Sequence, residues 1–73
     1  MTFQTMVFNE AKASGRLAKG PIVRFFDGNV EHQRRAWIDS EDGQLYVVLN
    51  REAYKFRPYR DDIQVYDFVI GRI

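Results

Sequence analysis

Short apolar runs separated by turn-forming residues give this chain its pattern. Most runs are rich in β-branched and aromatic residues and alternate between two faces, which is typical of strands. The predicted strands are Phe3–Phe8, Ile22–Phe26, Val30–Asp39, Gln44–Leu49, Ala53–Arg60 and Ile63–Ile70. Asn9 is placed to cap one short helical turn over residues 10–13, which Gly15 would end.

Glycine-bearing turns connect these strands into hairpins. Asp27-Gly28-Asn29 joins the second strand to the third, and Ser40–Gly43 joins the third to the fourth. We therefore expect a mainly β fold, a small antiparallel sheet or open barrel of about five to six short strands with at most one short helix. The predicted core consists of Ile22, Phe25, Trp37, Leu45, Val47, Leu49, Val65 and Val69.

Length and composition limit what the chain can be. It has 73 residues, which we expect to form a single domain over residues 1–73, and a chain this short buries only about 60% of its unfolded surface. It has no cysteine, so a thiolate zinc site is excluded and a reducing, cytoplasmic location is predicted. No apolar run approaches the roughly 18 residues of a membrane span, and the first residues do not resemble a signal peptide.

Residues with catalytic potential are few. His32 beside Glu31 could act as a general base, but a solvent-facing strand histidine is the favoured interpretation. Asp39, Glu41 and Asp42 offer carboxylates for a hard cation, yet they lack calcium-loop spacing and are typical of a solvated hairpin tip. We therefore expect no enzymatic activity, no cofactor and no metal site.

Two basic stretches supply the candidate binding residues. The net charge is only +1, but basic residues gather in residues 10–24 and again in 51–60, where they alternate with aromatic ones. On a strand this alternation puts Tyr54 and Phe56 on the face opposite Lys55. The predicted partner-binding residues are Lys12, Arg16, Lys19, Arg24, Tyr54, Arg57, Tyr59 and Arg60.

Two kinds of partner fit these residues. Aromatic and basic side chains together suit stacking on bases and contacting phosphates, as in small β-barrels that bind single-stranded nucleic acid. A nearly neutral chain would bind phosphates weakly, however, and burial in a core explains the same aromatics more simply. Eleven aromatics in so short a chain put several at the surface, which favours a protein partner and a monomeric binder. Phe3–Phe8 and Lys55–Tyr59 are candidate edge strands for β-augmentation by that partner.

A cysteine-free single domain of this length, with mixed charge and no catalytic set, resembles the small host-takeover proteins of bacterial viruses. Its length is similar to that of RNA polymerase-binding transcription regulators among them. The resemblance covers the whole chain in length and character and assigns no residue a role. It implies binding to host RNA polymerase in the bacterial cytoplasm, with inhibition of transcription initiation and an effect on termination. Phage inhibitors of nucleic-acid-guided defence complexes are similar to the same degree.

Overall fold

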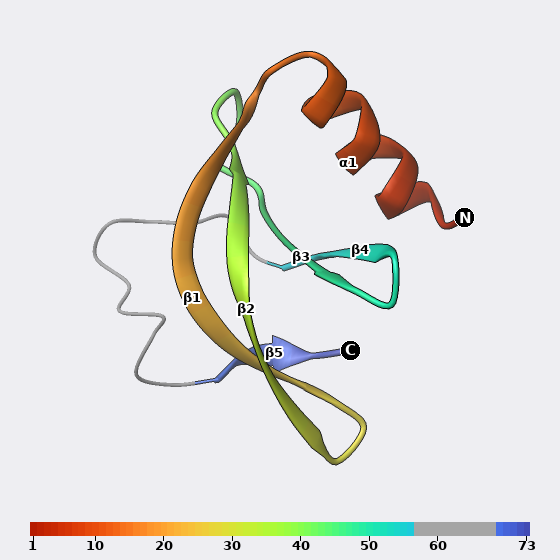
Figure 1. Ribbon diagram of the computed structural model, residues 1–73, viewed down its shortest axis with the longest axis vertical. Coiled ribbons are helices and arrows are strands. Elements are labelled where there is room, and N and C mark those ends of the chain that lie inside the picture. The colour runs from red at the N-terminus through yellow and green to blue at the C-terminus, as the bar shows by residue number, and fades with distance from the viewer. Residues whose placement is uncertain (57–68) are drawn as a thin grey trace.

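The computed structural model describes residues 1–56 and 69–73, and this part of the chain contains five strands and one helix. The elements are α1 (Phe3–Ala13), β1 (Leu17–Asp27), β2 (Val30–Asp39), β3 (Leu45–Leu49), β4 (Glu52–Lys55) and β5 (Val69–Arg72). The strands form one curled sheet in the order β4-β3-β2-β1-β5, and α1 packs beside β4 (Figure 1). The prediction of a mainly β fold with one short helix is confirmed.

Both predicted hairpins are present. β1 pairs antiparallel with β2 from Leu17 opposite Asp39 to Asp27 opposite Val30, and β2 pairs antiparallel with β3. Gly28 in the first turn has a φ of 61°, a left-handed conformation that glycine adopts without strain. β5 departs from the antiparallel prediction, because it pairs parallel with β1 at the edge of the sheet opposite β4.

A β-bulge in β1 divides that strand between the two faces of the sheet. The register with β2 shifts between Lys19 and Ile22, so one extra residue is inserted at Gly20-Pro21. Because side chains alternate along a strand, this insertion turns Val23 to the face opposite Leu17. It also leaves Ile22 exposed over 44% of its surface, so the prediction that Ile22 belongs to the core was wrong.

The main core lies on one face of the curled sheet. Its fully or nearly fully buried members are Val23, Phe25, Ala36, Leu45, Val47 and Leu49, with Tyr54, Phe56 and Ile70 packed against them. The rings of Phe25 and Phe56 lie 5.9 Å apart between centroids. Core placement is thus confirmed for Phe25 and for the alternate residues of β3. Val65 lies outside the described residues.

A second, smaller core lies on the opposite face, beneath α1. Phe8 of the helix packs edge-on against Tyr46 of β3, with ring centroids 5.5 Å apart, and Ala53 of β4 completes the buried set. Burial, followed by the nearby carboxylates of Asp42 and Asp39, raises the pKa of the Tyr46 hydroxyl above its ordinary value. β3 is therefore covered on both faces, which explains its continuous apolar sequence.

The segment Phe3–Phe8, predicted as a strand, is the first half of α1. The Thr2 hydroxyl accepts the Thr5 backbone N–H at 3.2 Å and caps the start of the helix. At the other end Gly15 has a φ of 73°, and the Arg16 N–H donates to the Ala11 carbonyl at 3.0 Å, which closes a Schellman motif. The burial of Thr5, the Thr2 cap and the Schellman motif at Gly15 together outweigh the β-prone composition of this segment.

Other boundary predictions also change at α1 and β5. Asn9, predicted as an N-cap, lies inside α1 rather than before a separate short helix. The last strand was expected over Ile63–Ile70 with Gly71 as its end, but β5 continues through Gly71 to Arg72. A Cβ at Gly71 would come within 2.5 Å of the Phe56 ring, so glycine allows this aromatic side chain to pack on the strand. Residues 63–68 lie outside the described residues.

Candidate partner-binding surface

A groove lies between α1 and the sheet. Its volume is about 480 Å³, and its lining residues are Thr5, Phe8, Asn9, Lys12, Leu17, Trp37, Val48, Arg51 and Ala53. The helix residues follow a spacing of three or four and therefore share one face of α1. Half-buried Trp37 and Leu17 come from the antiparallel β1–β2 pair, so the helix and the sheet form the two sides of the groove.

Two basic side chains line this groove. Lys12 lies in the last turn of α1, and Arg51 lies in the β3–β4 turn, where its φ of 68° places it in the left-handed region. Within residues 1–56 and 69–73, neither side chain forms an ion pair or a hydrogen bond. The groove therefore combines an apolar floor with two positive charges.

The solvent side of α1 adds an apolar surface next to the groove. Phe3 is 76% exposed and Met6 is 56% exposed, and residues three apart on a helix are neighbours. The Met1 sulfur lies 3.8 Å from the Asn9 Nδ2 atom, so Met1 folds back toward the groove rim. α1 consequently presents large apolar side chains to solvent as well as to the sheet, which is unusual for a surface helix.

The four predicted residues of the first basic stretch do not form one patch. Lys12 lines the groove, and exposed Lys19 shares the face of its cross-strand partner Trp37. Arg24 has Gln33 as its cross-strand partner and lies on that face too, farther along β1, where it forms an ion pair with Glu31, with 2.5 Å between nitrogen and oxygen. Glu31 therefore neutralises the charge of Arg24, whereas Lys12 and Lys19 form no ion pair within the described residues.

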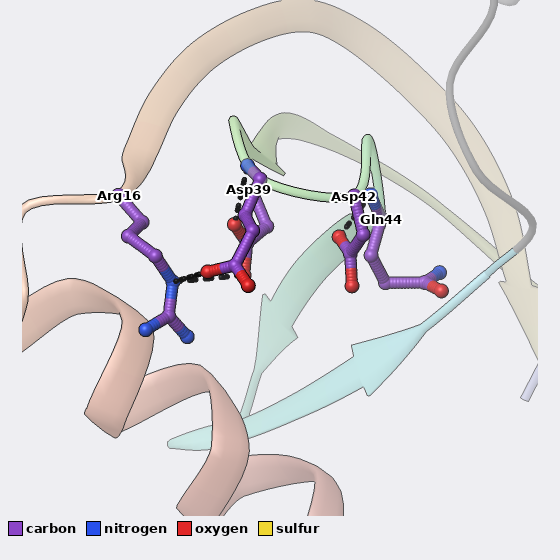
Figure 2. Close-up of polar contacts among 5 residues, drawn as sticks. Arg16, Asp39, Asp42 and Gln44 are labelled. Carbon is purple, nitrogen blue, oxygen red and sulfur yellow. Dashed lines mark hydrogen bonds and ion pairs between the residues drawn. The ribbon is translucent and has the colours of Figure 1, made fainter.

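Arg16 is held within the protein by carboxylates of the β2–β3 turn. Its Nε atom lies 3.4 Å from an oxygen of Asp39 and 3.5 Å from an oxygen of Glu41 (Figure 2). Asp39 also accepts the Glu41 backbone N–H at 2.9 Å, while Asp42 accepts the Gln44 N–H at the same distance. These carboxylates organise the turn, and no cluster of metal-ligating side chains occurs in the described part of the chain.

The second basic stretch is only partly described. Tyr54 and Phe56 pack against the main core, while Lys55 is exposed on the opposite face of β4. This arrangement confirms the predicted alternation for these residues and leaves neither ring as an open stacking platform. Arg57, Tyr59 and Arg60 lie outside the described residues.

Side chains of α1 occupy the outer edge of β4. The Ala53 N–H donates to the Thr5 hydroxyl at 3.0 Å, and the Lys55 N–H donates to the Gln4 side-chain oxygen at 2.7 Å. These are the edge donors that an added strand would need. β-augmentation at Phe3–Phe8 was a wrong prediction because that segment is helical, and at β4 the helix already satisfies both donors.

The imagined Glu31–His32 pair does not form. Adjacent strand residues point to opposite faces, and Glu31 pairs with Arg24 while the His32 ring stacks on Phe25 at 5.7 Å between centroids. His32 is half-buried, so it contributes to packing rather than facing only water. Ser14 lies at the C-cap of α1, and Ser40 lies in the β2–β3 turn.

Glu52 ties β4 to the start of α1. Its carboxylate accepts the Thr5 hydroxyl, the Thr2 hydroxyl at 3.2 Å and the Thr2 N–H at 3.4 Å. The Thr5 hydrogen bond, then that of the Thr2 backbone, lowers the pKa of Glu52 below its ordinary value. Because the folded pKa is depressed, this stabilisation is present above the unfolded pKa of about 4.3 and is lost as pH falls through the folded value.

We expect Glu52→Gln to lower the melting temperature at neutral pH and to lose that difference as the pH falls through the lowered pKa of Glu52, where the wild-type side chain also becomes neutral. Thermal unfolding followed by circular dichroism across this range measures both effects. The control is Glu10→Gln in the last turn of α1, where the helix dipole disfavours a negative charge, so this change should not destabilise the protein at neutral pH. A pH-independent difference between Glu52→Gln and wild type would contradict the prediction.

The comparisons with known proteins give no relative for this chain. No protein-family model matches it, and neither a curated protein nor a solved structure matches it. α1, the helix found in the described residues, has neither the length nor the apolar character needed to cross a lipid bilayer.

Proposed function

We propose that this protein is a non-enzymatic protein-binding module whose partner is the RNA polymerase of a bacterial host. By occupying the polymerase surface, the protein would inhibit transcription initiation and would also affect termination. The choice of RNA polymerase rests on the resemblance in length and composition to phage regulators. The binding mode rests on the geometry of α1 and the groove beside it.

The observation that carries the proposal is the exposed apolar face of α1. Phe3 and Met6 lie side by side in solvent, and Met1 extends the same surface toward the groove. Phenylalanine and methionine are enriched in protein interfaces, and methionine adapts its shape to a partner. A module of this kind acts by covering a surface, so it needs no catalytic set.

The same geometry disfavours the alternative of a single-stranded nucleic-acid binder. Such proteins use exposed aromatic platforms along a basic groove. Here Tyr54 and Phe56 pack on the core, and Arg16 and Arg24 are paired with carboxylates. A protein partner therefore fits the described residues better than a nucleic acid does.

Binding to purified bacterial RNA polymerase after nuclease treatment tests the proposal. We expect a tagged form of the chain to retain the polymerase. We also expect initiation to be suppressed in a reconstituted transcription assay when the protein is mixed with the polymerase before promoter DNA is added. Retention of a single-stranded oligonucleotide at low salt, with a steep loss as salt rises, would instead support the nucleic-acid alternative. Failure to bind polymerase in the absence of nucleic acid would reject this partner.

We expect the double substitution of Phe3→Ser with Met6→Ser to weaken polymerase binding at least about tenfold, because interface anchors cost about 2 kcal/mol or more when removed. Both side chains are exposed, so the melting temperature should change little. Val30→Ser is the matched control, since Val30 is 59% exposed at the start of β2, next to the turn that lies far from α1 in Figure 1. Full affinity of a folded double variant would exclude the α1 face from the interface.

A further inference from the structure

We propose that the groove between α1 and the sheet binds an acidic segment of the partner protein. One large apolar side chain of the segment packs beside Trp37, and its neighbouring carboxylates contact Lys12 and Arg51. This inference rests on the proposed function, because it states which surface the partner occupies and what chemistry the partner presents there.

The shape and lining of the groove suit an apolar anchor. Its volume of about 480 Å³ lies within the roughly 300–1,000 Å³ of typical binding pockets. Trp37, Phe8, Leu17 and Val48 supply most of its apolar wall, and Trp37 remains only half-buried. An aromatic or aliphatic side chain placed here would cover the exposed part of Trp37.

The charge of the groove selects the residues that flank the anchor. Lys12 and Arg51 reach the groove from different elements, and none of the described residues that line it is acidic. Glu52, next to Arg51 in sequence, is engaged by Thr2 and Thr5 at the start of α1. Carboxylates of a partner are the complement to two such cations, and an arginine fork binds a carboxylate through two hydrogen bonds.

Charge alone would also attract a phosphate, but the neighbouring surface favours a polypeptide. The exposed face of α1 with Phe3 and Met6 adjoins the groove through Asn9, which lies three residues after Met6. A peptide segment leaving the groove can bury this apolar face with its own side chains. A phosphate backbone would leave it uncovered, and so would a small anion that only fills the groove.

Trp37 is the single tryptophan of the chain, so its fluorescence reports directly on the groove. The probe is a blocked peptide, Gly-Ser-Glu-Phe-Leu-Asp-Ser-Gly, compared with the neutral version in which Gln and Asn replace Glu and Asp. We expect the acidic peptide to shift Trp37 emission saturably, and the neutral peptide to bind at least about tenfold more weakly. Rising salt should reduce this difference.

Charge-neutral variants test the two cations. Lys12→Gln and Arg51→Gln should each lower the affinity for the acidic peptide several-fold and leave the affinity for the neutral peptide unchanged. Arg34→Gln is the control with the same change in net charge, since Arg34 is exposed on β2 and donates only to the carbonyl of its neighbour Gln33 among the described residues. Circular dichroism confirms that each variant is folded, and if Lys12→Gln unfolds, Arg51→Gln alone decides.

Three results would overturn the inference: no response of Trp37 to the acidic peptide, equal binding of both peptides, or a response to an oligonucleotide but to neither peptide. The polymerase assay separates this inference from the proposed function. Normal polymerase binding by folded Lys12→Gln and Arg51→Gln would reject the groove assignment and keep the proposed function. If peptide binding requires both cations but the protein does not bind RNA polymerase, the groove assignment is kept and RNA polymerase is rejected as the partner.

Discussion

Replacing Phe25 with alanine is expected to destabilise the protein by about 3–5 kcal/mol, enough to unfold much of it at ambient temperature. Phe25 is fully buried, with the Phe56 ring at 5.9 Å on one side and the His32 ring at 5.7 Å on another. A folded domain has on the order of 0.05–0.15 kcal/mol of stability per residue, so the total free energy of unfolding of a chain this short is small. Urea unfolding followed by circular dichroism measures the change.

The matched control is Phe3→Ala, which removes the same side chain from a site that is 76% exposed. It should alter the free energy of unfolding by less than about 0.5 kcal/mol. A loss below about 1 kcal/mol in Phe25→Ala would show that the core does not depend on this ring. The pair of variants therefore separates core packing from the surface role proposed for Phe3.

The main-core face of β3, and the turns that contain glycine, could be predicted from the sequence. Leu45, Val47 and Leu49 were placed on one buried face, and the structure confirms it. Gly28 and Gly43 both adopt positive φ in the turns where they were expected. These predictions succeed because the period of two and the need for left-handed turn residues are local properties of the chain.

α1 could not be separated from a strand by its composition alone. Phe3 and Met6 are exposed, so the apolar pattern of this segment does not report burial as it usually does. Thr5, Phe8 and Ala11 are the buried residues, and their spacing of three marks the helix. Threonine and alanine are only weakly apolar, so their spacing does not stand out as a buried helical face. The β-prone composition therefore led to the prediction of a strand.

The bulge and the parallel edge strand depend on tertiary contacts. The strand predicted to begin at Ile22 instead begins at Leu17, passes through Gly20-Pro21 and changes face there. Ile22 was therefore assigned to the core although it lies on the opposite face from Val23. The pairing of β5 with β1 joins residues far apart in sequence, and no local pattern encodes it.

The candidate site was predicted only in part. Lys12 was identified from local charge, but Trp37, which lines the same groove, was assigned to the core, and Arg51 was not among the predicted binding residues. Arg16 was expected at an interface, and the structure shows it paired with Asp39 and Glu41. Sequence shows where charges gather but not which of them are neutralised by residues from another element.

The last prediction concerns the edge of β4, which Thr5 occupies. Thr5→Val keeps the shape of the side chain and removes the hydroxyl that accepts the Ala53 N–H at 3.0 Å. A buried donor left without a partner costs about 1–3 kcal/mol, so we expect a loss of that size in urea unfolding. Thr5→Ser keeps the hydroxyl and should retain most of the stability.

Thr5→Val should also change how the protein associates, because it releases a backbone donor at the edge of the sheet. Thr2 and Glu52 lose the same hydroxyl, so the start of α1 is loosened together with the edge that it covers. Light scattering over a range of concentrations should show self-association of Thr5→Val but not of Thr5→Ser. If both variants stay as stable and as monomeric as wild type, the helix does not protect this edge, and strand addition at β4 becomes available to a partner.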